Sequence, residues 1–374
     1  MPEKHVHIIA FDIPVPVNYG GAIDIFYKLK SLKKAGIKIH LHCFEYDRKP
    51  SPLLDELCTE VFYYKRDNSK TKLFSSLPYI VATRYSEELL KNILRDNYPI
   101  LFEGLHSCYF LNHKKIRNRR KIVRTHNIEH EYYQNLGKIE KNMFRRYYYL
   151  NEAGKLERFE KILEYADGLA VISNNDAHYY SRKFKNVTTI SAFHPHEKIV
   201  SRPGKGSFAL YHGSLDVGEN NEAALFLIRQ VFDDLKFKLY IAGNKPSKEL
   251  KSAVNGRNNI ILKTGLTSED IYKLVADAHV NILPTFQSTG IKLKLLAALY
   301  RGRFCLVNPP MIRKTGLESL CICCETAGEF KSEIKNLFSR EYNASENAKR
   351  EEILLHKGFS NDYNAAAMVN LLFP

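Results

Sequence analysis

Short apolar runs alternate with helical patterns along most of this chain, and this alternation constrains the fold more than any other feature. A typical apolar run ends in a glycine or polar turn and is followed by apolar residues at helical spacing. Strands that are separated by helices pair in parallel, and helices then cover both faces of the sheet. The expected strands are residues 6–11, 37–44, 100–103, 121–124, 168–172, 208–212, 238–242, 260–262, 279–283 and 304–307.

The alternation is interrupted at residues 191–206, SAFHPHEKIVSRPGKG, which lose periodicity and contain prolines and glycines. A length of 374 residues favours about two domains. We therefore predict two α/β domains that are joined by this segment.

Residues 283–302, LPTFQSTGIKLKLLAALYRG, combine a strand end, a turn of small residues and a helix. The free N–H groups and the positive dipole end of such a helix suit a phosphate, and Lys292 and Lys294 add positive charge. A plain strand-to-helix turn with two solvated lysines fits the pattern equally well. The candidate phosphate-binding residues here are Ser288, Thr289, Gly290, Ile291 and Lys292.

Polar residues also follow the predicted strand 121–124, in the sequence RTHNIEH at 124–130. Open α/β sheets bind ligands at the carboxyl ends of their strands, so His126, Asn127 and Glu129 are candidate site residues, although a lone histidine is usually structural. The loop after the first strand contains Tyr19, Gly20 and Gly21 but not the GxGxxG dinucleotide fingerprint. The glycine pair either keeps the wall of a cleft low or simply makes a turn.

The chain carries 56 basic and 41 acidic residues, a net charge of +15, which favours anionic partners. No zinc-finger or RNA-binding signature is present, so nucleic acid is not expected. No apolar run is long enough to span a membrane, and the first residues do not resemble a signal peptide. The seven cysteines have no disulfide-framework spacing, and LCICC at 320–324 reads as a strand of reduced thiols rather than a zinc site.

Two basic segments lie before residue 151. Residues 114–124 contain seven basic and no acidic side chains, and residues 132–150 interleave basic with aromatic residues, as in MFRRYYYL. The second segment is either a solvated helix with a tyrosine-rich core face, a patch that faces a membrane or an acceptor, or a stacking surface for nucleic acid.

Several motifs in the same order resemble those of glycosyltransferases of the GT-B fold, in the retaining "glycosyl transferases group 1" class, and most closely those of bacterial surface-polysaccharide assembly. The resemblance covers nearly the whole chain. It rests on Tyr19-Gly20-Gly21, RTHNIEH at 124–130, HGSLDVGENNEAALFLI at 212–228, YIAGNKP at 240–246, the 283–302 stretch and FSNDYNAAAMVNLL at 359–372.

The resemblance implies a GT-B architecture, in which two Rossmann-like domains with parallel sheets face each other across a cleft. Residues 1–195 would bind the acceptor, residues 196–355 would bind the nucleotide sugar, and a helix within residues 356–374 would return to the first domain. The implied activity is metal-independent transfer of a hexose from a UDP- or GDP-sugar to a glycan or lipid-linked acceptor, with retention and without a cofactor. The implied location is cytoplasmic, or peripheral on the inner face of the plasma membrane.

The resemblance also assigns roles to residues. His126 would be catalytic, and Tyr19, Gly20, Gly21, Asn127 and Glu129 would lie on the acceptor side. No metal ligands are expected. The donor-binding residues would be Gly213, Ser214, Lys245, Ser288, Thr289, Gly290, Ile291 and Lys292.

One position departs from the family pattern. Ala297 stands where relatives carry a glutamate that is taken to bind the donor ribose. Two other functions therefore stay open, namely a non-catalytic glycosyltransferase-like binding subunit and a nucleotide-sugar epimerase of the same fold.

Overall fold

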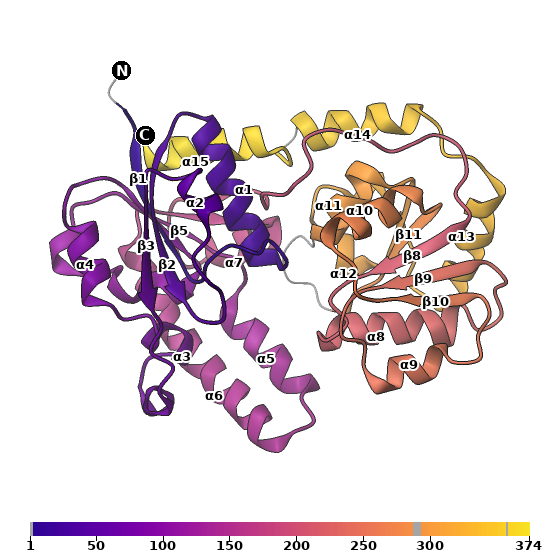
Figure 1. Ribbon diagram of the computed structural model, residues 1–374, viewed down its shortest axis with the longest axis horizontal. Helices are drawn as coiled ribbons and strands as arrows, with labels where there is room; N and C mark the ends of the chain where they lie inside the picture. Colours follow the sequence, from indigo (N-terminus) through magenta and orange to yellow (C-terminus); the bar gives the residue numbers. More distant parts are fainter. Residues whose placement is uncertain (1–2, 287–292, 357) are drawn as a thin grey trace. The chain divides into compact units, whose positions relative to one another are not determined.

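The computed structural model of the chain describes residues 3–286, 293–356 and 358–374. The chain divides into two compact units, one made of Met1–Pro195 with Ser360–Pro374 and the other of His196–Phe359. Each unit is built on one parallel sheet with helices packed against it (Figure 1). The last helix, α15 (Asn361–Leu372), belongs to the first unit although it follows the second unit along the chain.

The first unit contains a seven-stranded sheet in the order β3-β2-β1-β4-β5-β6-β7, and all neighbouring strands are parallel. The order runs outward from β1 on one side and from β4 on the other, so the direction of the crossovers reverses between β1 and β4. The strands are β1 (His5–Ala10), β2 (Lys38–Glu45), β3 (Glu60–Lys65), β4 (Ile100–Glu103), β5 (Lys121–Arg124), β6 (Gly168–Val171) and β7 (Val187–Thr189).

Helices and short turns connect these strands. The helices are α1 (Gly20–Lys34), α2 (Pro52–Asp55), α3 (Tyr79–Ala82), α4 (Glu87–Ile93), α5 (Glu129–Ile139), α6 (Met143–Phe159) and α7 (Asn174–Tyr180). The 3₁₀ turns are η1 (Lys70–Phe74), η2 (Leu105–Phe110), η3 (Lys114–Ile116) and η4 (Glu160–Tyr165).

The second unit repeats the same topology, with six parallel strands in the order β10-β9-β8-β11-β12-β13. Its strands are β8 (Phe208–His212), β9 (Lys238–Ala242), β10 (Ile260–Lys263), β11 (Val280–Leu283), β12 (Phe304–Val307) and β13 (Ile322–Cys323). Its helices and turns are α8 (Gly218–Phe226), the π-helical turn η5 (Leu227–Val231), α9 (Lys248–Val254), α10 (Ser268–Asp277), α11 (Leu293–Arg301), α12 (Pro309–Ile312), η6 (Glu318–Leu320), α13 (Ala327–Ser339) and α14 (Ser345–His356).

The cores follow from the alternation of side chains along the strands. In β1, Val6 and Ile8 pack in one apolar cluster with α1 and α15, whereas Ile9 packs in the cluster on the opposite face of the sheet. Met368 of α15 is fully buried in the first of these clusters. Figure 1 shows α15 (yellow) beside α1 (indigo), and the two helices pack against each other. The core of the first unit is thus completed by the end of the chain.

The predicted α/β fold is confirmed, and all ten predicted strands are present with ends shifted by at most one residue. Residues 60–65 and 187–189 form two strands that were not predicted. No helix among the described residues has the length and hydropathy needed to cross a membrane. The seven cysteines are free thiols.

Candidate functional site

The strand order reverses between β1 and β4, and open parallel sheets bind ligands outside the carboxyl ends of the strands at such a reversal. The predicted site residues of the first unit gather at this edge. Tyr19 precedes α1, which follows β1, and His126 follows β5, the neighbour of β4.

Four buried charged side chains lie directly beneath this edge, and we call them the ionic cluster: Asp24, Lys28, Glu103 and Arg124. The Lys28 Nζ atom donates to Asp24 Oδ2 at 2.9 Å and to Glu103 Oε1 at 2.6 Å. Arg124 donates from Nη2 to Asp24 Oδ1 at 2.9 Å. Two acids and two bases therefore neutralise one another away from water, which is the condition under which buried charges are tolerated.

The sequence brings this cluster together through simple geometry. Asp24 and Lys28 are four residues apart and share one face of α1. Glu103 and Arg124 are the last residues of neighbouring strands and are register partners, so their side chains leave the sheet on the same face. Asp24 also accepts from the Phe193 backbone N–H at 2.8 Å, so the cluster anchors the segment after β7 as well.

The cluster keeps both acids ionised. Burial would raise the pKa of Asp24, but Arg124 and Lys28 together hold that pKa well below its usual range. Burial opposes ionisation of Glu103 too, and Lys28 with the hydrogen bond from His126 keeps its pKa below the ordinary value. Neither carboxylate gains a proton at neutral pH.

His126 is held by this cluster. Its Nε2 atom lies 3.0 Å from Glu103 Oε2 and 4.0 Å from Asp24 Oδ2. The Phe11 ring meets the imidazole edge-on, with 5.3 Å between the ring centres. Backbone at Gly104 has a φ of +69°, which favours glycine, and an added Cβ would lie 3.7 Å from His126 Cδ2. The imidazole is thus fixed on several sides, and its side chain is only 9% exposed.

Metal ligation was not predicted here, yet ligand atoms of Asp24, Glu103 and His126 lie within 4.8 Å of one another. The donor set alone would suit a divalent cation. However, Lys28 and Arg124 already supply two positive charges to the two carboxylates. A metal ion at this position would have to displace or face these cations, so the electrostatics do not favour one.

Glu129 was predicted on the acceptor side, and it is the first residue of α5, at the same edge. Its side chain is buried. Its Oε1 atom finds no hydrogen-bond partner in the described part of the chain and lies 3.9 Å from Nδ1 of His106. Burial raises the pKa of the Glu129 carboxyl to about 8, so it is mostly protonated at neutral pH. Asn127 lies between His126 and Glu129 along the chain. Its backbone carbonyl accepts a hydrogen bond from the Tyr180 hydroxyl at 3.2 Å.

The loop before α1 is well anchored. The Tyr19 hydroxyl donates to Asp12 Oδ2 at 3.2 Å, and the Arg48 guanidinium lies 4.5 Å from the centre of the Tyr19 ring. Gly20 and Gly21 form the first turn of α1. A Cβ on Gly21 would lie 2.7 Å from the Phe11 ring, so a larger residue here would have to displace that ring.

The second unit has its own reversal of strand order, between β8 and β11. Gly213 and Ser214 follow β8, as predicted from sequence, and Gly213 packs tightly against Asn220. Lys294 Nζ donates to Asn220 Oδ1 at 2.8 Å, so this lysine of α11 lies at the same edge. Lys245 has an 80% exposed side chain whose Nζ lies 3.7 Å from Asp216 Oδ2.

The central part of the predicted phosphate loop, Ser288, Thr289, Gly290, Ile291 and Lys292, lies outside the described residues. Its two ends are described. Thr285 is buried, and its backbone is fixed by Asn308, which both donates to and accepts from it. Ala297 is only 2% exposed within α11, so a glutamate at this position would start from a buried site.

Sequence reasoning missed most of the ionic cluster. It identified His126 but not Glu103, Asp24 or Lys28, which only the folded chain brings to the histidine. A signal was present, because Asp24 and Lys28 lie four residues apart on the apolar face of a helix, and Glu103 ends an apolar strand. The basic segment at residues 114–124 lies only in part at the surface, since Arg119, Lys121 and Arg124 are buried.

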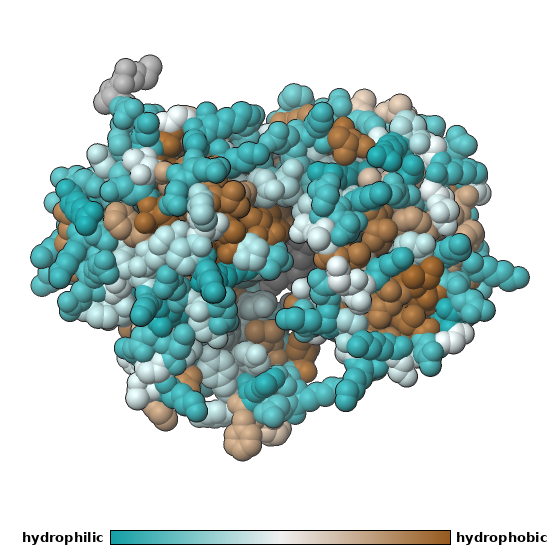
Figure 2. All heavy atoms as spheres, in the orientation of Figure 1, coloured by the Kyte–Doolittle hydropathy of each residue, from teal (hydrophilic) through white to brown (hydrophobic). Residues whose placement is uncertain are grey.

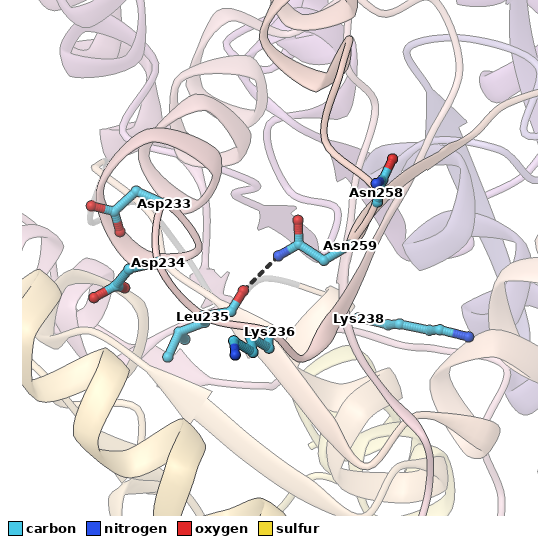
Figure 3. A pocket seen from close by; sticks show the side chains of 7 residues that line it. All are labelled: Asp233, Asp234, Leu235, Lys236, Lys238, Asn258 and Asn259. Atoms are coloured by element: carbon cyan, nitrogen blue, oxygen red, sulfur yellow. Dashed lines mark hydrogen bonds between the residues drawn. The ribbon is translucent and has the colours of Figure 1, made fainter.

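A hollow of about 390 Å³ in the second unit lies away from this edge (Figure 3). Its lining residues lie at the amino ends of β9 and β10. The Asn259 side chain donates there to the Leu235 carbonyl at 2.6 Å. Its acids, Asp233 and Asp234, are already paired with Lys331. We therefore do not assign a ligand to it.

The sequence is similar to a known protein family and to a curated relative. Residues 207–340 match the family model described as "Glycosyl transferases group 1". The chain is 26% identical over 315 residues to an uncharacterized 44.6 kDa protein in the cps region of Klebsiella pneumoniae. The aligned region covers 79% of this chain and 81% of the relative.

Solved structures share the fold at low identity. A TarM variant from S. aureus, in complex with fondaparinux, alpha-GlcNAc-glycerol and UDP, superposes with a TM-score of 0.68 at 12% identity over 99% of this chain and all of the other. An alpha,alpha-trehalose-phosphate synthase (UDP-forming) from Burkholderia xenovorans, in complex with glucose-6-phosphate, gives 0.62 at 10% identity over 98% and 99%. The predicted GT-B fold and the resemblance to group 1 glycosyltransferases are confirmed.

Proposed function

We propose that the protein is a glycosyltransferase that moves a hexose from a UDP- or GDP-sugar to a glycan or lipid-linked acceptor, with retention and without a metal or cofactor. The observation that carries this proposal is the family match over residues 207–340, on a unit with the strand order of nucleotide-binding Rossmann folds. The relative from a cps region supports a role in the synthesis of a surface polysaccharide.

The second unit would hold the nucleotide diphosphate. In glycosyl transfer the bond from the anomeric carbon to the diphosphate breaks and a bond to an acceptor oxygen forms, so the departing charge must be stabilised. Lys294, together with the predicted residues Gly213, Ser214 and Lys245, gives this edge of the sheet positive charge and close backbone approach. The predicted loop 288–292 would supply backbone N–H groups to the phosphates.

The first unit would hold the acceptor and the transferred sugar. His126 would contact the sugar, and Tyr19, Gly20, Gly21, Asn127 and Glu129 would line the acceptor side. A protonated Glu129 could donate a hydrogen bond to a sugar oxygen, which an ionised carboxylate cannot do.

An anionic membrane is the proposed surface partner, and the hairpin of α5 and α6 is the element that supports it. The two helices pack closely, since a Cβ on Gly137 would lie 2.9 Å from Leu150. Its tip exposes apolar side chains, with Phe144 87% and Met143 73% exposed. Figure 2 shows apolar spheres at the lower tip of this unit, where Figure 1 places the end of the hairpin. The exposed bases around the tip are Lys138, Lys141, Arg145 and Arg146.

Ala297 favours one competing function, a glycosyltransferase-like subunit that binds without catalysis. The test is a turnover assay with a panel of UDP- and GDP-sugars, with and without a polyprenyl-diphosphate-linked acceptor and with EDTA throughout. We expect release of nucleotide diphosphate only when acceptor is present, and a loss of at least about 100-fold in His126→Ala. Binding of the donor without turnover would support the non-catalytic function, and a sugar isomer without acceptor would indicate an epimerase.

A further inference from the structure

His126 faces two buried carboxylates with its Nε2 atom. Glu103 Oε2 lies 3.0 Å from Nε2, and the second nearby carboxylate, Asp24, approaches the same nitrogen at 4.0 Å. A carboxylate accepts hydrogen bonds and donates none when it is ionised, so the nitrogen that faces it must carry the proton. Because both acids face Nε2, the single proton of the neutral imidazole is placed there, and Nδ1 keeps its lone pair in that form.

We infer that Glu103 is a positioning residue, which fixes His126 in the Nε2–H tautomer and thereby presents Nδ1 as a hydrogen-bond acceptor at the ligand-binding edge of the sheet. The sugar ligand of Nδ1 rests on the proposed function, whereas the tautomer of His126 does not. The ligand of Nδ1 is a hydroxyl group of the bound sugar or of the acceptor, since a neutral imidazole nitrogen accepts from O–H groups. No proton needs to be transferred for this role.

The ionic cluster explains why Glu103 can do this. Lys28 lies 2.6 Å from Oε1, the other oxygen of the same carboxylate, and its side chain is fully buried. Glu103 thus accepts from Lys28 with one oxygen and from His126 with the other. Lys28 also donates to Asp24 at 2.9 Å, and Arg124 supplies a second cation to that acid. A glutamine at this position has one acceptor oxygen for two neighbours, so when Lys28 takes that oxygen the amide NH2 faces Nε2 and the preference for the Nε2–H form is lost.

The position of Glu103 supports a role at the site and not only in folding. Glu103 is the last residue of β4, one of the two strands between which the crossovers reverse, and the next residue is Gly104 with its positive φ. The chain therefore turns away at once, and an added Cβ on Gly104 would approach both His106 and His126. The Glu103 carboxylate is thus the side chain of β4 that hydrogen-bonds the histidine.

Histidine tautomers can be measured directly by NMR of protein with ¹⁵N-labelled imidazoles. The His126 signals are assigned by their loss in His126→Gln. We expect a protonated Nε2 and an unprotonated Nδ1 in the wild type near neutral pH. In Glu103→Gln we expect a mixture of tautomers, and in Glu103→Asp a return toward the Nε2–H form. Nδ1–H as the main form in the wild type, or an unchanged tautomer in Glu103→Gln, would overturn the inference.

A second glutamate supplies the matched control. Glu60 Oε2 lies 2.7 Å from Nδ1 of His40, in the same unit but on β3, away from the ligand-binding edge. Glu60→Gln should leave the His126 signals and turnover unchanged. If Glu103→Gln does not fold by circular dichroism, the wild type and Glu103→Asp still test the tautomer.

Kinetics then separate this inference from the proposed function. With an active donor and acceptor, Glu103→Gln should lower kcat by at least about tenfold with a smaller change in KM, and Glu103→Asp should recover part of it. Equal loss in both variants would mean a structural role only. Absence of turnover in the wild type would refute the proposed function and leave the tautomer result standing.

Discussion

Lys28 is the single residue on which the buried charges depend most. Replacing it with methionine keeps the volume but leaves Asp24 and Glu103 facing only one buried cation. We expect Lys28→Met to lower the free energy of unfolding by about 3–5 kcal/mol at pH 7, measured by urea denaturation. Lys34→Met, which removes an exposed pair with Asp362 from the same helix, should cost less than about 1 kcal/mol. Equal decreases in the free energy of unfolding for the two variants would show that the buried pairs of Lys28 contribute no more than an exposed pair.

Histidines in β1 and β2 make stability depend on pH. Burial lowers the pKa of His7 to about 4, against the opposing effect of Asp96, and the paired His42 also has a lowered pKa through burial. His7 Nδ1 and His42 Nε2 are 2.8 Å apart, so one ring must stay neutral there to accept the hydrogen bond. Other groups that face the pair are His40, Arg119, Tyr64 and Tyr98.

The direction in which stability changes with pH follows from how many protons the folded and unfolded states bind. Between pH 6.5 and 4 the unfolded chain binds the proton that folded His7 excludes, so stability is lost as pH falls through this window. We expect His7 alone to account for about 3 kcal/mol of the decrease. His7→Gln should flatten the dependence measured by urea denaturation at several pH values, whereas the exposed His178→Gln should not. A wild-type profile that is flat across this window would contradict the expectation.

Among the elements, the α5–α6 hairpin gives the clearest prediction. Its apolar tip and basic flanks should bind vesicles of anionic lipid, with about 1 kcal/mol from each basic residue near the surface, and salt should weaken binding. Phe144→Ser with Met143→Ser should reduce sedimentation with vesicles, and Arg145→Glu with Arg146→Glu should reduce it further at low salt. The control is Tyr165→Ser, another exposed apolar residue of this unit outside the hairpin. Vesicle binding that is unchanged by both double substitutions would show that the hairpin is not the membrane-binding element.

For the molecule as a whole, the sequence predicted ten of the strands because each depends on a local pattern. The strand 60–65 was missed because its residues, EVFYYK, lie in a mixed segment, and tertiary packing decides their conformation. The candidate site was predicted only in part. His126 stands in a recognisable polar segment, but its partner Glu103 is 23 residues away and meets it only when β4 and β5 pair.

Removal of α15 should affect the first unit and not the second. Ala365, Met368 and Leu372 are buried against α1 and the sheet, and a core that loses several large side chains loses several kcal/mol. A chain that ends at Phe359 should therefore show an early unfolding transition for the first unit in calorimetry, while the second unit keeps its own. A single transition, unchanged from the full chain, would show that α15 contributes little.

The contribution of α15 to the first unit has a consequence for synthesis. A ribosome releases the chain from its amino end, so all strands of the first unit emerge before residues 196–359 and before the helix that seals them. The second unit can close as soon as it is outside the exit tunnel, whereas the first must wait with Ile8, Leu29 and Leu41 incompletely covered. The unit whose strands are made first is therefore the one whose core is closed later, and its apolar residues stay partly exposed to water during that interval.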